Sequence, residues 1–318
     1  MFRKFKYGFI LLCVLNLLAC SQPKVEGEVY NGDRVEYYAD GELRSVKAVK
    51  EGVLDGKFKK FYVTGLLKKQ GVYVDGYFHG EVKNFFENGS VESVSHYIHG
   101  SLEGLLKEFY DTGVLRSVLA YKKNVRHGSR RVFYINSNVM LVENYKNGLL
   151  DGVVREYHLN GEWKVVKNYK NGNLEGEYRE YFESGQLKKR VNYIDGKLLG
   201  AAKSYYENGA IESEGFYKRN DLQGQSSTFN KKGDLLVEVG FKDGEVAGGF
   251  RRYYPNGNLK KKEESGKYGI RNIVTEFYDG GSVKSERVFV SGMLVQEVRY
   301  DKDGRTIQPM RQNALPEE

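Results

Sequence analysis

Few side chains in this sequence are of the types that perform catalysis or hold metals. Two cysteines are too few for a disulfide framework or a multi-cysteine zinc site. The five histidines are His79, His96, His99, His127 and His158. His96 and His99 stand three residues apart, which on a strand places them on opposite faces, so we do not expect them to form a metal pair.

His79 and His127 occupy one slot of a recurring pattern. The same slot holds Asp55, Glu103, Asp151 and Glu175 elsewhere in the chain. Because an acid or a histidine fits equally, we interpret the slot as a solvated loop position, with a weak metal-binding row as the alternative. The sequence contains neither glycine-rich phosphate-binding pattern and no unique group of Ser, His and carboxylate. It therefore predicts a protein that is not an enzyme and holds no metal or catalytic cofactor; a surface hydrolase is the rival from the enzyme class.

Basic residues form a more regular pattern. They recur every 24 residues, two residues before an aromatic, in eight of eleven copies: Lys59, Lys83, Lys107, Arg131, Arg155, Arg179, Lys203 and Arg251. Strand alternation places each on the same face as that aromatic, so Tyr157, Tyr181 and Tyr205 join them as candidate ligand-binding residues. A two-residue turn would also pair the aromatics across the hairpin with basic residues of the return strand: Lys68, Arg116, Lys164, Lys188, Lys260 and Lys284.

Two interpretations of these rows stay open. The charges either form a solvated face that supports the aromatic rows by cation–π contacts, or line a groove for an anionic or carbohydrate polymer. Acidic neighbours count against the groove because they would neutralise it locally: Glu87, Asp111, Glu156, Glu183 and Glu207. We expect the second aromatic, the next apolar slot and a later tyrosine of each copy to share the opposite face.

The N-terminus reads as a targeting segment. Residues 1–19 join Arg3, Lys4 and Lys6 to an apolar run that is too short for a comfortable membrane span. Leu17-Leu18-Ala19-Cys20 resembles the lipobox of bacterial lipoproteins. The resemblance implies a signal peptide over 1–19, a diacylated Cys20, a tether over 20–31 and localisation at the cell envelope, at the outer membrane if the organism has one.

Removal of this segment changes the charge and the thiol content. It would leave 47 of the 50 basic residues against 42 acidic ones, a net charge of +5. Such a balance does not indicate a nucleic-acid partner. Cys13 would leave with the signal and Cys20 would carry lipid, so the mature chain would have no free thiol.

The rest of the chain is one repeat of 24 residues. Glycines from Gly32 to Gly248 stand 24 residues apart without an insertion, and an eleventh unit begins at Asn272. Five residues after each start comes an aromatic, and six residues after that an apolar residue, a place that holds the only tryptophan, Trp163. The last units drift from the pattern. We expect residues 297–318 to form a cap strand and a frayed tail.

The residue pattern of each unit predicts a β-hairpin. The stretch 203–207 is aromatic-rich and lacks Gly and Pro, as strands do, and Asn208-Gly209 predicts a tight turn with two left-handed residues. After a second strand, Asn171-Gly172 or Asp195-Gly196 predicts the next turn. The predicted fold is all-β, an elongated array of eleven hairpin units over 32–296. At about 4.8 Å per strand it would be on the order of 100 Å long.

The repeat resembles the bacterial variant of the MORN repeat. The clearest copies are 176–199, 200–223 and 80–103. The resemblance implies an elongated antiparallel β-strip with a binding or scaffolding role, and some relatives carry the label of a YwqK-type antitoxin component. We therefore expect a lipid-anchored scaffold that binds a protein, a glycan or a lipid headgroup without catalysis. An antitoxin or immunity-like protein that neutralises one toxin is the alternative.

Overall fold

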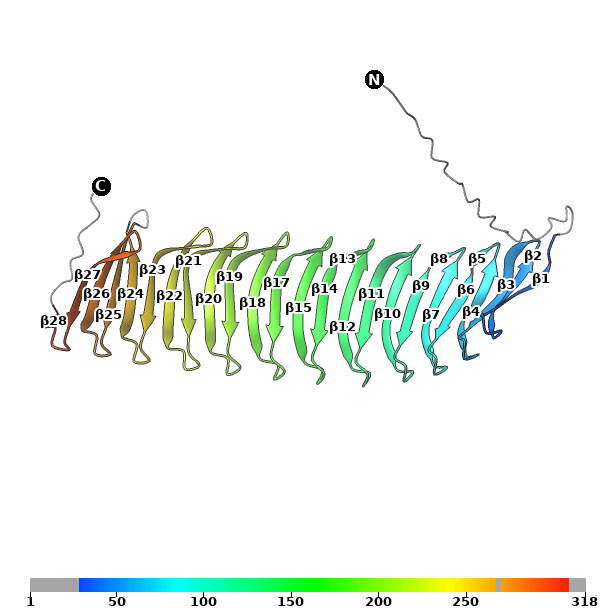
Figure 1. The fold of residues 1–318 in the computed structure, drawn as a ribbon, viewed down its shortest axis with the longest axis horizontal. Coiled ribbons are helices and arrows are strands. Elements are labelled where there is room, and N and C mark those ends of the chain that lie inside the picture. Colours follow the sequence, from blue (N-terminus) through cyan, green and yellow to red (C-terminus); the bar gives the residue numbers. More distant parts are fainter. Residues whose placement is uncertain (1–28, 267–269, 309–318) are drawn as a thin grey trace, which may run out of the picture.

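The chain forms one long antiparallel sheet. The computed structural model describes residues 29–266 and 270–308, so the predicted signal peptide, Cys20 and most of the tether lie outside it. Within these residues the sheet has 28 strands, and consecutive long strands pair antiparallel along the chain. The first and the last described strands lie at opposite ends of the strip (Figure 1). The all-β hairpin array predicted from the repeat is confirmed.

Eleven hairpins follow the predicted period within the described residues. Their first strands are β1 Gly32–Tyr37, β3 Val53–Phe61, β6 Gly80–Phe85, β9 Gly104–Phe109, β11 Val125–Phe133, β14 Gly152–Tyr157, β17 Gly176–Tyr181, β19 Lys197–Tyr205, β21 Asp221–Phe229, β23 Glu245–Tyr253 and β25 Arg271–Phe277. Their return strands are β2 Leu43–Lys50, β4 Leu67–Val74, β7 Val91–Ile98, β10 Leu115–Lys122, β12 Val139–Lys146, β15 Trp163–Lys170, β18 Leu187–Ile194, β20 Ile211–Lys218, β22 Leu235–Lys242, β24 Leu259–Ser265 and β26 Val283–Val290. Short strands precede four units: β5 Tyr77–Phe78, β8 Ser101–Leu102, β13 Leu149–Leu150 and β16 Asn173–Leu174.

The loop inside each hairpin differs from the predicted turn. In the hairpin β19–β20, the amide of Tyr206 donates to the carbonyl of Ala210 and the amide of Gly209 donates to the carbonyl of Tyr206, both at 2.9 Å. This closes a three-residue loop, which needs only one left-handed residue, and Gly209 supplies it at φ 85°. Asn208 is not left-handed, so the predicted two-residue Asn-Gly turn is wrong.

The turn between hairpins is the two-residue turn. Asp195 and Gly196 have φ of 48° and 74°, and Asn171 and Gly172 have 50° and 85°. Ile194 pairs with Lys197 across the first of these turns. Both central residues are therefore left-handed, as a type I′ turn requires, and this prediction is confirmed. In Figure 1 these turns run along the upper edge of the strip and the three-residue loops along the lower edge.

A β-bulge resets the pairing beside each three-residue loop. Phe61 pairs with Leu67 while the preceding Lys60 pairs with Lys69, so Lys68 has no partner across the ladder. The predicted pairing of the first aromatic with the basic return-strand residue is therefore wrong. The bulge also places the apolar residue that follows the loop, Leu67 in this hairpin, on the face of the first aromatic. The sequence predicted this residue on the opposite face.

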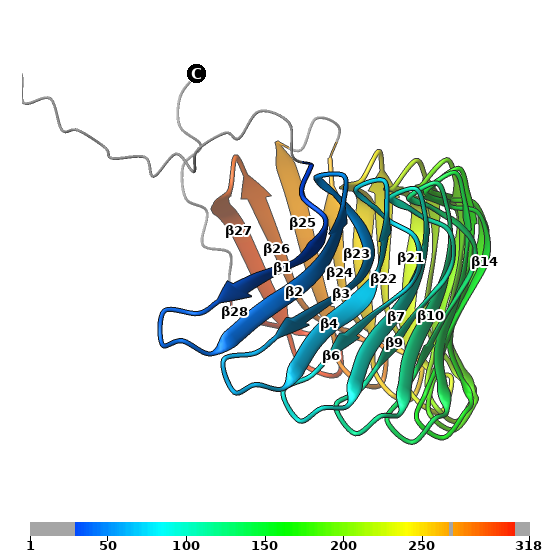
Figure 2. The ribbon, with the colours of Figure 1, turned by 90° about the vertical axis from the view of Figure 1, so that its right-hand side faces the viewer.

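The sheet is curved (Figure 2), and its buried side chains are concentrated on one of its faces. We call it the buried face and define it by seven apolar side chains that are each at most 7% exposed: Phe58, Val82, Leu119, Val132, Val154, Val165 and Val191. Counted from the first residue of each unit, they occupy positions 3, 5, 14 and 16. The later tyrosine at position 18 lies on this face too, since Tyr145 is 9% exposed.

The C-terminal end adds a partial hairpin. β27 (Met293–Tyr300) and β28 (Thr306–Gln308) pair through Tyr300 and Thr306. The amide of Asp301 donates to the carbonyl of Arg305 at 2.8 Å, which repeats the three-residue loop of the full units. The described part of the region predicted as cap and tail, residues 297–308, therefore includes most of this partial hairpin.

Candidate functional site

The ten candidate ligand-binding residues share one face of the sheet. Lys59, Lys83, Lys107, Arg131, Arg155, Arg179 and Lys203 occupy position 4, and Tyr157, Tyr181 and Tyr205 occupy position 6. We call this the basic–aromatic face and define it by positions 2, 4, 6, 12, 15 and 17, opposite the buried face. The rings of Trp163 and Tyr181 meet edge to face at 5.9 Å, which confirms that positions 12 and 6 lie on one side. Ligand binding there stays a prediction.

Acids of the same face pair with some of these cations. Lys83 Nζ lies 2.8 Å from Glu81, Lys203 Nζ lies 2.9 Å from Glu214, and Arg179 binds Glu177. The hydrogen bond to Glu214 raises the pKa of Lys203. Burial alone would raise the pKa of Glu177, but hydrogen bonds from Arg179 and Arg190 lower it below its ordinary value.

A neighbouring part of this face carries no acid. We call it the central basic stretch and define it by positions 4 and 6 of three successive units: Lys107, Phe109, Arg131, Phe133, Arg155 and Tyr157. Valines oppose all three cations on both neighbouring strands: Val94, Val118, Val142 and Val166. Positions 2, 12 and 17 of these units are also free of acids. No ion pair joins the three cations to any described acid, so their charge is not neutralised locally.

The acids expected to neutralise this stretch lie elsewhere. Glu156 is on the buried face, where Lys167 Nζ lies 2.8 Å from its carboxylate. The other four are exposed or half-buried residues of the three-residue loops: Glu87, Asp111, Glu183 and Glu207. Acids also line the edge of the type I′ turns, where they bind backbone amides as described below. The predicted neutralisation is therefore wrong for the central basic stretch.

In five units a basic residue at position 13 makes a cation–π contact with the second aromatic of its unit. Lys68 Nζ lies 4.9 Å from the ring centroid of Tyr62, and Lys260 Nζ lies 5.2 Å from that of Tyr254. Arg44, Lys188 and Lys284 stand over the equivalent rings of Tyr38, Phe182 and Tyr278. These cations are the bulge residues at position 13. The clamping role therefore belongs to position 13, which leaves the position 4 cations free of it.

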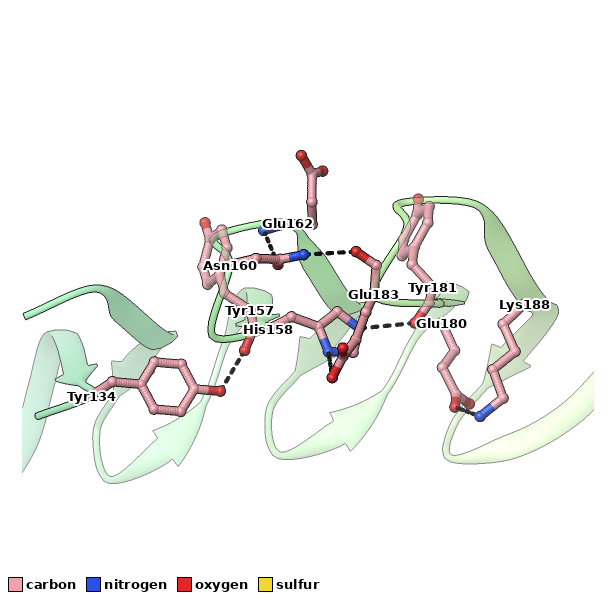
Figure 3. A network of polar contacts seen from close by, with 9 residues as sticks. All are labelled: Tyr134, Tyr157, His158, Asn160, Glu162, Glu180, Tyr181, Glu183 and Lys188. Atoms are coloured by element: carbon pink, nitrogen blue, oxygen red, sulfur yellow. Dashed lines mark hydrogen bonds and ion pairs between the residues drawn. The ribbon is translucent and has the colours of Figure 1, made fainter. Parts of the chain in front are cut away.

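Hydrogen bonds between units run along the loop edge (Figure 3). Tyr134 Oη donates to the carbonyl of Tyr157 at 2.8 Å, and His158 Nε2 donates to the carbonyl of Tyr181 at 3.1 Å. Tyrosines at the same slot repeat this bond 22 or 23 residues ahead: Tyr38, Tyr62, Tyr110, Tyr206, Tyr254 and Tyr278. A tyrosine at the second aromatic position thus ties its hairpin to the next, and His158 takes the place of a tyrosine in one unit.

The loop asparagines perform two structural tasks. Asn160 Nδ2 donates to the carbonyl of Glu183 in the next unit at 2.7 Å, while its Oδ1 accepts from the amide of Glu162 at 3.0 Å (Figure 3). Asn88, Asn208 and Asn256 make the same contact to the next unit. These side-chain bonds explain why asparagine occupies the loop. The sequence had suggested a different reason, a left-handed backbone at this residue.

The sequence pattern of these hairpins matches a known family. A model described as "MORN repeat variant" matches residues 78–99, 102–123, 150–171, 174–195, 198–219 and 249–265. These segments are MORN-variant repeats. Each of the first five matched segments spans the short pairing strand or its equivalent, the hairpin and the first residue of the type I′ turn.

Solved structures share only a distant likeness with the MORN-variant strip. The TcdB2–TccC3–Cdc42 complex and a Photorhabdus luminescens Tc holotoxin pore are each 11% identical over 86% of this chain, with a TM-score of 0.19. TcdB2–TccC3 without its hypervariable C-terminal region gives the same values over 89%. This chain spans 18% of each of those chains, and a likeness this low carries no argument about function. Comparison with curated proteins gives no match.

The slot shared by acids and histidines joins consecutive MORN-variant repeats. Glu175 accepts the amide of Asp195 at 3.0 Å, and Glu103 accepts the amide of Lys123 at 2.6 Å. Each carboxylate therefore holds the first residue of the next type I′ turn. The slot thus has a structural role, whereas the sequence suggested only a solvated loop position. His79 occupies the slot in one repeat, and its ring lies 5.3 Å from that of His99. His99 is in a turn at φ 42°, so strand alternation did not apply to it.

Neither a metal cluster nor a membrane-spanning helix is found in the part of the chain that the structure describes. No three side chains of His, Cys, Asp or Glu gather there in a way that could hold a metal ion. No described helix is long and apolar enough to cross a membrane.

Beyond the central basic stretch the same face is hollowed. A hollow of about 490 Å³ lies among Arg190, Asn192, Ala201, Lys203 and Tyr205. Ala201 contributes only a methyl group at a place where most other units carry larger side chains. Two of the candidate residues, Lys203 and Tyr205, therefore line a recess, whereas Lys107 and Arg131 stand exposed on the open sheet.

Tyr134→Phe tests the bonds between repeats. It should lower the free energy of unfolding by about 0.5–1.5 kcal/mol, because it removes one hydrogen bond and leaves the ring in place. Phenylalanine fits this slot, since Phe86 and Phe182 occupy it in other units. Phe182→Tyr is the reciprocal variant and should gain part of that energy. Chemical denaturation measures both, and equal stability of all three proteins would contradict a role for these bonds.

Proposed function

We propose that the protein is a non-catalytic binding module that holds an extended, negatively charged chain along its basic–aromatic face. The observation that carries the proposal is the acid-free central basic stretch. Lys107, Arg131 and Arg155 have valines on both sides and no acid partner among the described residues. A charge without a local partner is available to an external one, and the surrounding apolar surface weakens competition from water.

The spacing of the cations suits a linear partner. Successive cations are two strands apart, roughly 10 Å, which is comparable to the screening length of about 8 Å at physiological salt. Three such charges in register attract a polymer with repeated negative charges more strongly than a small ion, because each contact lowers the entropy cost of the next. Phe109, Phe133 and Tyr157 lie beside the cations, and Leu105 and Trp163 are 49% and 46% exposed on the same face. These side chains offer apolar area to the partner's backbone.

The repeated architecture supports binding over catalysis. Position 6 is aromatic in all eleven units and position 4 is basic in eight of them, so the face repeats one pair of side chains along its length. The alternative role for the basic residues, clamping aromatic rings, is performed by position 13. The cations at position 4 of the central basic stretch therefore have no cation–π or ion-pair role among the described residues.

The location of the module is part of the proposal. Lipid on Cys20 would hold the chain at a membrane of the cell envelope, and the tether up to residue 31 would connect the lipid to β1. The strip would then present its face to a charged envelope component such as an anionic polysaccharide. Binding in this manner needs no cofactor.

Arg131→Glu with Arg155→Glu tests the binding face. Association with dextran sulfate should weaken roughly tenfold or more, since two attractive charges become repulsive. The melting temperature should change little because exposed charges contribute at most about 1 kcal/mol each to folding. Calorimetric titration and thermal unfolding measure the two effects. Uncharged dextran should not bind either protein at the same concentration.

Lys260→Glu with Lys284→Glu is the matched control. It makes the same change in net charge at two clamping cations, so it should lower the melting temperature and leave most of the dextran sulfate affinity. If Arg131→Glu with Arg155→Glu instead lowered the melting temperature and left binding intact, the charges would be structural and the proposed function would fail.

A further inference from the structure

A second hollow opens on the buried face, behind the basic–aromatic face. It has a volume of about 310 Å³ and lies over β18, β19, β20 and β21. Ala202, Gly215 and Ser226 form its floor and side. It interrupts the row of close-packed side chains that continues from Phe58 to Val191 along this face.

The repeat itself shows why the hollow exists. Gly71 and Gly215 occupy the same position 16 of two different units. A Cβ added at Gly71 would meet Phe58 and Val82 at 2.9 Å, because these side chains fill the space above it and are 1% and 0% exposed. The residues at the equivalent places beside Gly215 are Ala202 and Ser226, which are too small to fill the same space. Three neighbouring positions of the core therefore all carry small residues.

The walls of the hollow are divided into an apolar end and a hydroxyl end. Val191, Leu198, Leu222 and Tyr217 supply aliphatic and aromatic surface. At the other end Ser204 Oγ lies 2.7 Å from Ser213 Oγ. Ser226 adds a third hydroxyl, which donates to the carbonyl of Glu214 at 3.1 Å.

Charges of both signs stand at the hydroxyl end. Lys189 lines the hollow and forms no ion pair with the acids that the structure describes. Glu212 receives a hydrogen bond from Ser204 at 3.0 Å. The side chains of Lys203 and Glu214 pair with each other at 2.9 Å on the basic–aromatic face, so they add no charge to this end. The end therefore offers donors and acceptors together with little net charge, which suits hydroxyl groups better than a carboxylate or an ammonium group.

We propose that this hollow binds one neutral sugar ring. The apolar C–H face of a pyranose would pack on Tyr217 and the leucines, and its hydroxyl groups would bond to Ser204, Ser213, Lys189 and Glu212. An apolar ligand would leave the hydroxyl end without partners, which costs free energy for each polar group desolvated. The site is on the opposite face from the central basic stretch, so the two can be tested separately.

The test fills the hollow with the residues that fill it elsewhere in the repeat. Ala202→Phe with Ser226→Val reproduces the packing of Phe58 and Val82 over Gly71 and should be at least as stable as the natural chain. N-acetyl-D-glucosamine and D-glucose at millimolar concentration are the probes, and glycerol is the polyol without a ring. Saturation-transfer NMR should show ring-proton signals of at least one sugar with the natural chain and none with the filled variant. Ser204→Ala with Ser213→Ala should weaken binding about tenfold.

Ala201→Phe is the matched control. It adds the same side chain one residue earlier, on the basic–aromatic face, and should retain the sugar signals. Gly215→Ala is a second, smaller filling variant for the case that the double variant does not fold. Its added Cβ would meet Leu222 at 3.2 Å and Ser226 at 3.3 Å inside the hollow, so it should weaken sugar binding. The proposal is wrong if the natural chain shows no transfer to either sugar, if glycerol gives equal transfer, or if Ala201→Phe abolishes the signals as fully as filling the hollow. Dextran sulfate binding should be unchanged in the filled variant, which separates this site from the proposed function.

Discussion

Phe58→Ala should lower the free energy of unfolding by about 3–5 kcal/mol. Phe58 is 1% exposed, and its ring centroid lies 4.8 Å from that of Tyr73 and 5.3 Å from that of Phe78. Phe78 in turn contacts Tyr97 of the next repeat at 5.4 Å, so one cluster joins two repeats. Truncation would remove the largest fully buried side chain of the described residues and leave a cavity that the β-ladder cannot close.

Amide hydrogen exchange combined with chemical denaturation measures this loss where it occurs. Since each repeat contacts only its neighbours, protection should fall most in β3 to β7 and little beyond β14. Tyr37→Ala is the control, because Tyr37 is 63% exposed at the end of the strip and should cost less than about 1 kcal/mol. Equal losses in the two variants, or a uniform loss of protection along the chain, would show that the array does not behave as a stack of coupled repeats.

The period and the hairpins could be predicted because they depend on local chemistry. Glycine every 24 residues and aromatic-rich segments between turn residues indicate strands and turns without knowledge of their packing. Asn171-Gly172 and Asp195-Gly196 were identified as turns for the same reason, and both have the left-handed backbone that the type I′ turn requires.

The faces of the sheet were harder to predict because a β-bulge shifts alternation by one residue. The bulge between Lys60 and Phe61 moved Leu67 to the face of the first aromatic and left Lys68 over Tyr62. The asparagine of the loop also led to the wrong turn type. Asn208 suggested a two-residue turn, whereas its side chain serves the next repeat by donating to the carbonyl of Lys231 at 2.7 Å.

Which row forms the core also depends on curvature, which the sequence pattern does not contain. The first aromatics are the most regular feature of the sequence, yet Tyr181 and Phe109 are half-buried on the basic–aromatic face. The fully buried side chains are the less regular residues of position 3, such as Val82 and Val154. The hollow at Gly215 did leave a signal in the sequence, since Ala202 and Ser226 depart from the larger residues of most other units at that position. Only the packing around Gly71 shows what that departure means.

Cys20→Ser should abolish acylation and release the protein from the membrane fraction. The Cys20 thiol is the proposed acyl acceptor, and two acyl chains at about 0.8 kcal/mol per buried CH₂ are sufficient for stable anchoring, whereas the serine variant keeps only the signal peptide. Metabolic labelling with an alkyne fatty acid, followed by fractionation, measures both effects. Cys13→Ser is the matched control, because Cys13 lies within the apolar run and should be lost with the signal in either case. Label on Cys20→Ser equal to that on the natural chain would reject the lipid anchor. The binding faces would remain testable on the soluble strip, since they lie in repeats that begin only after residue 31.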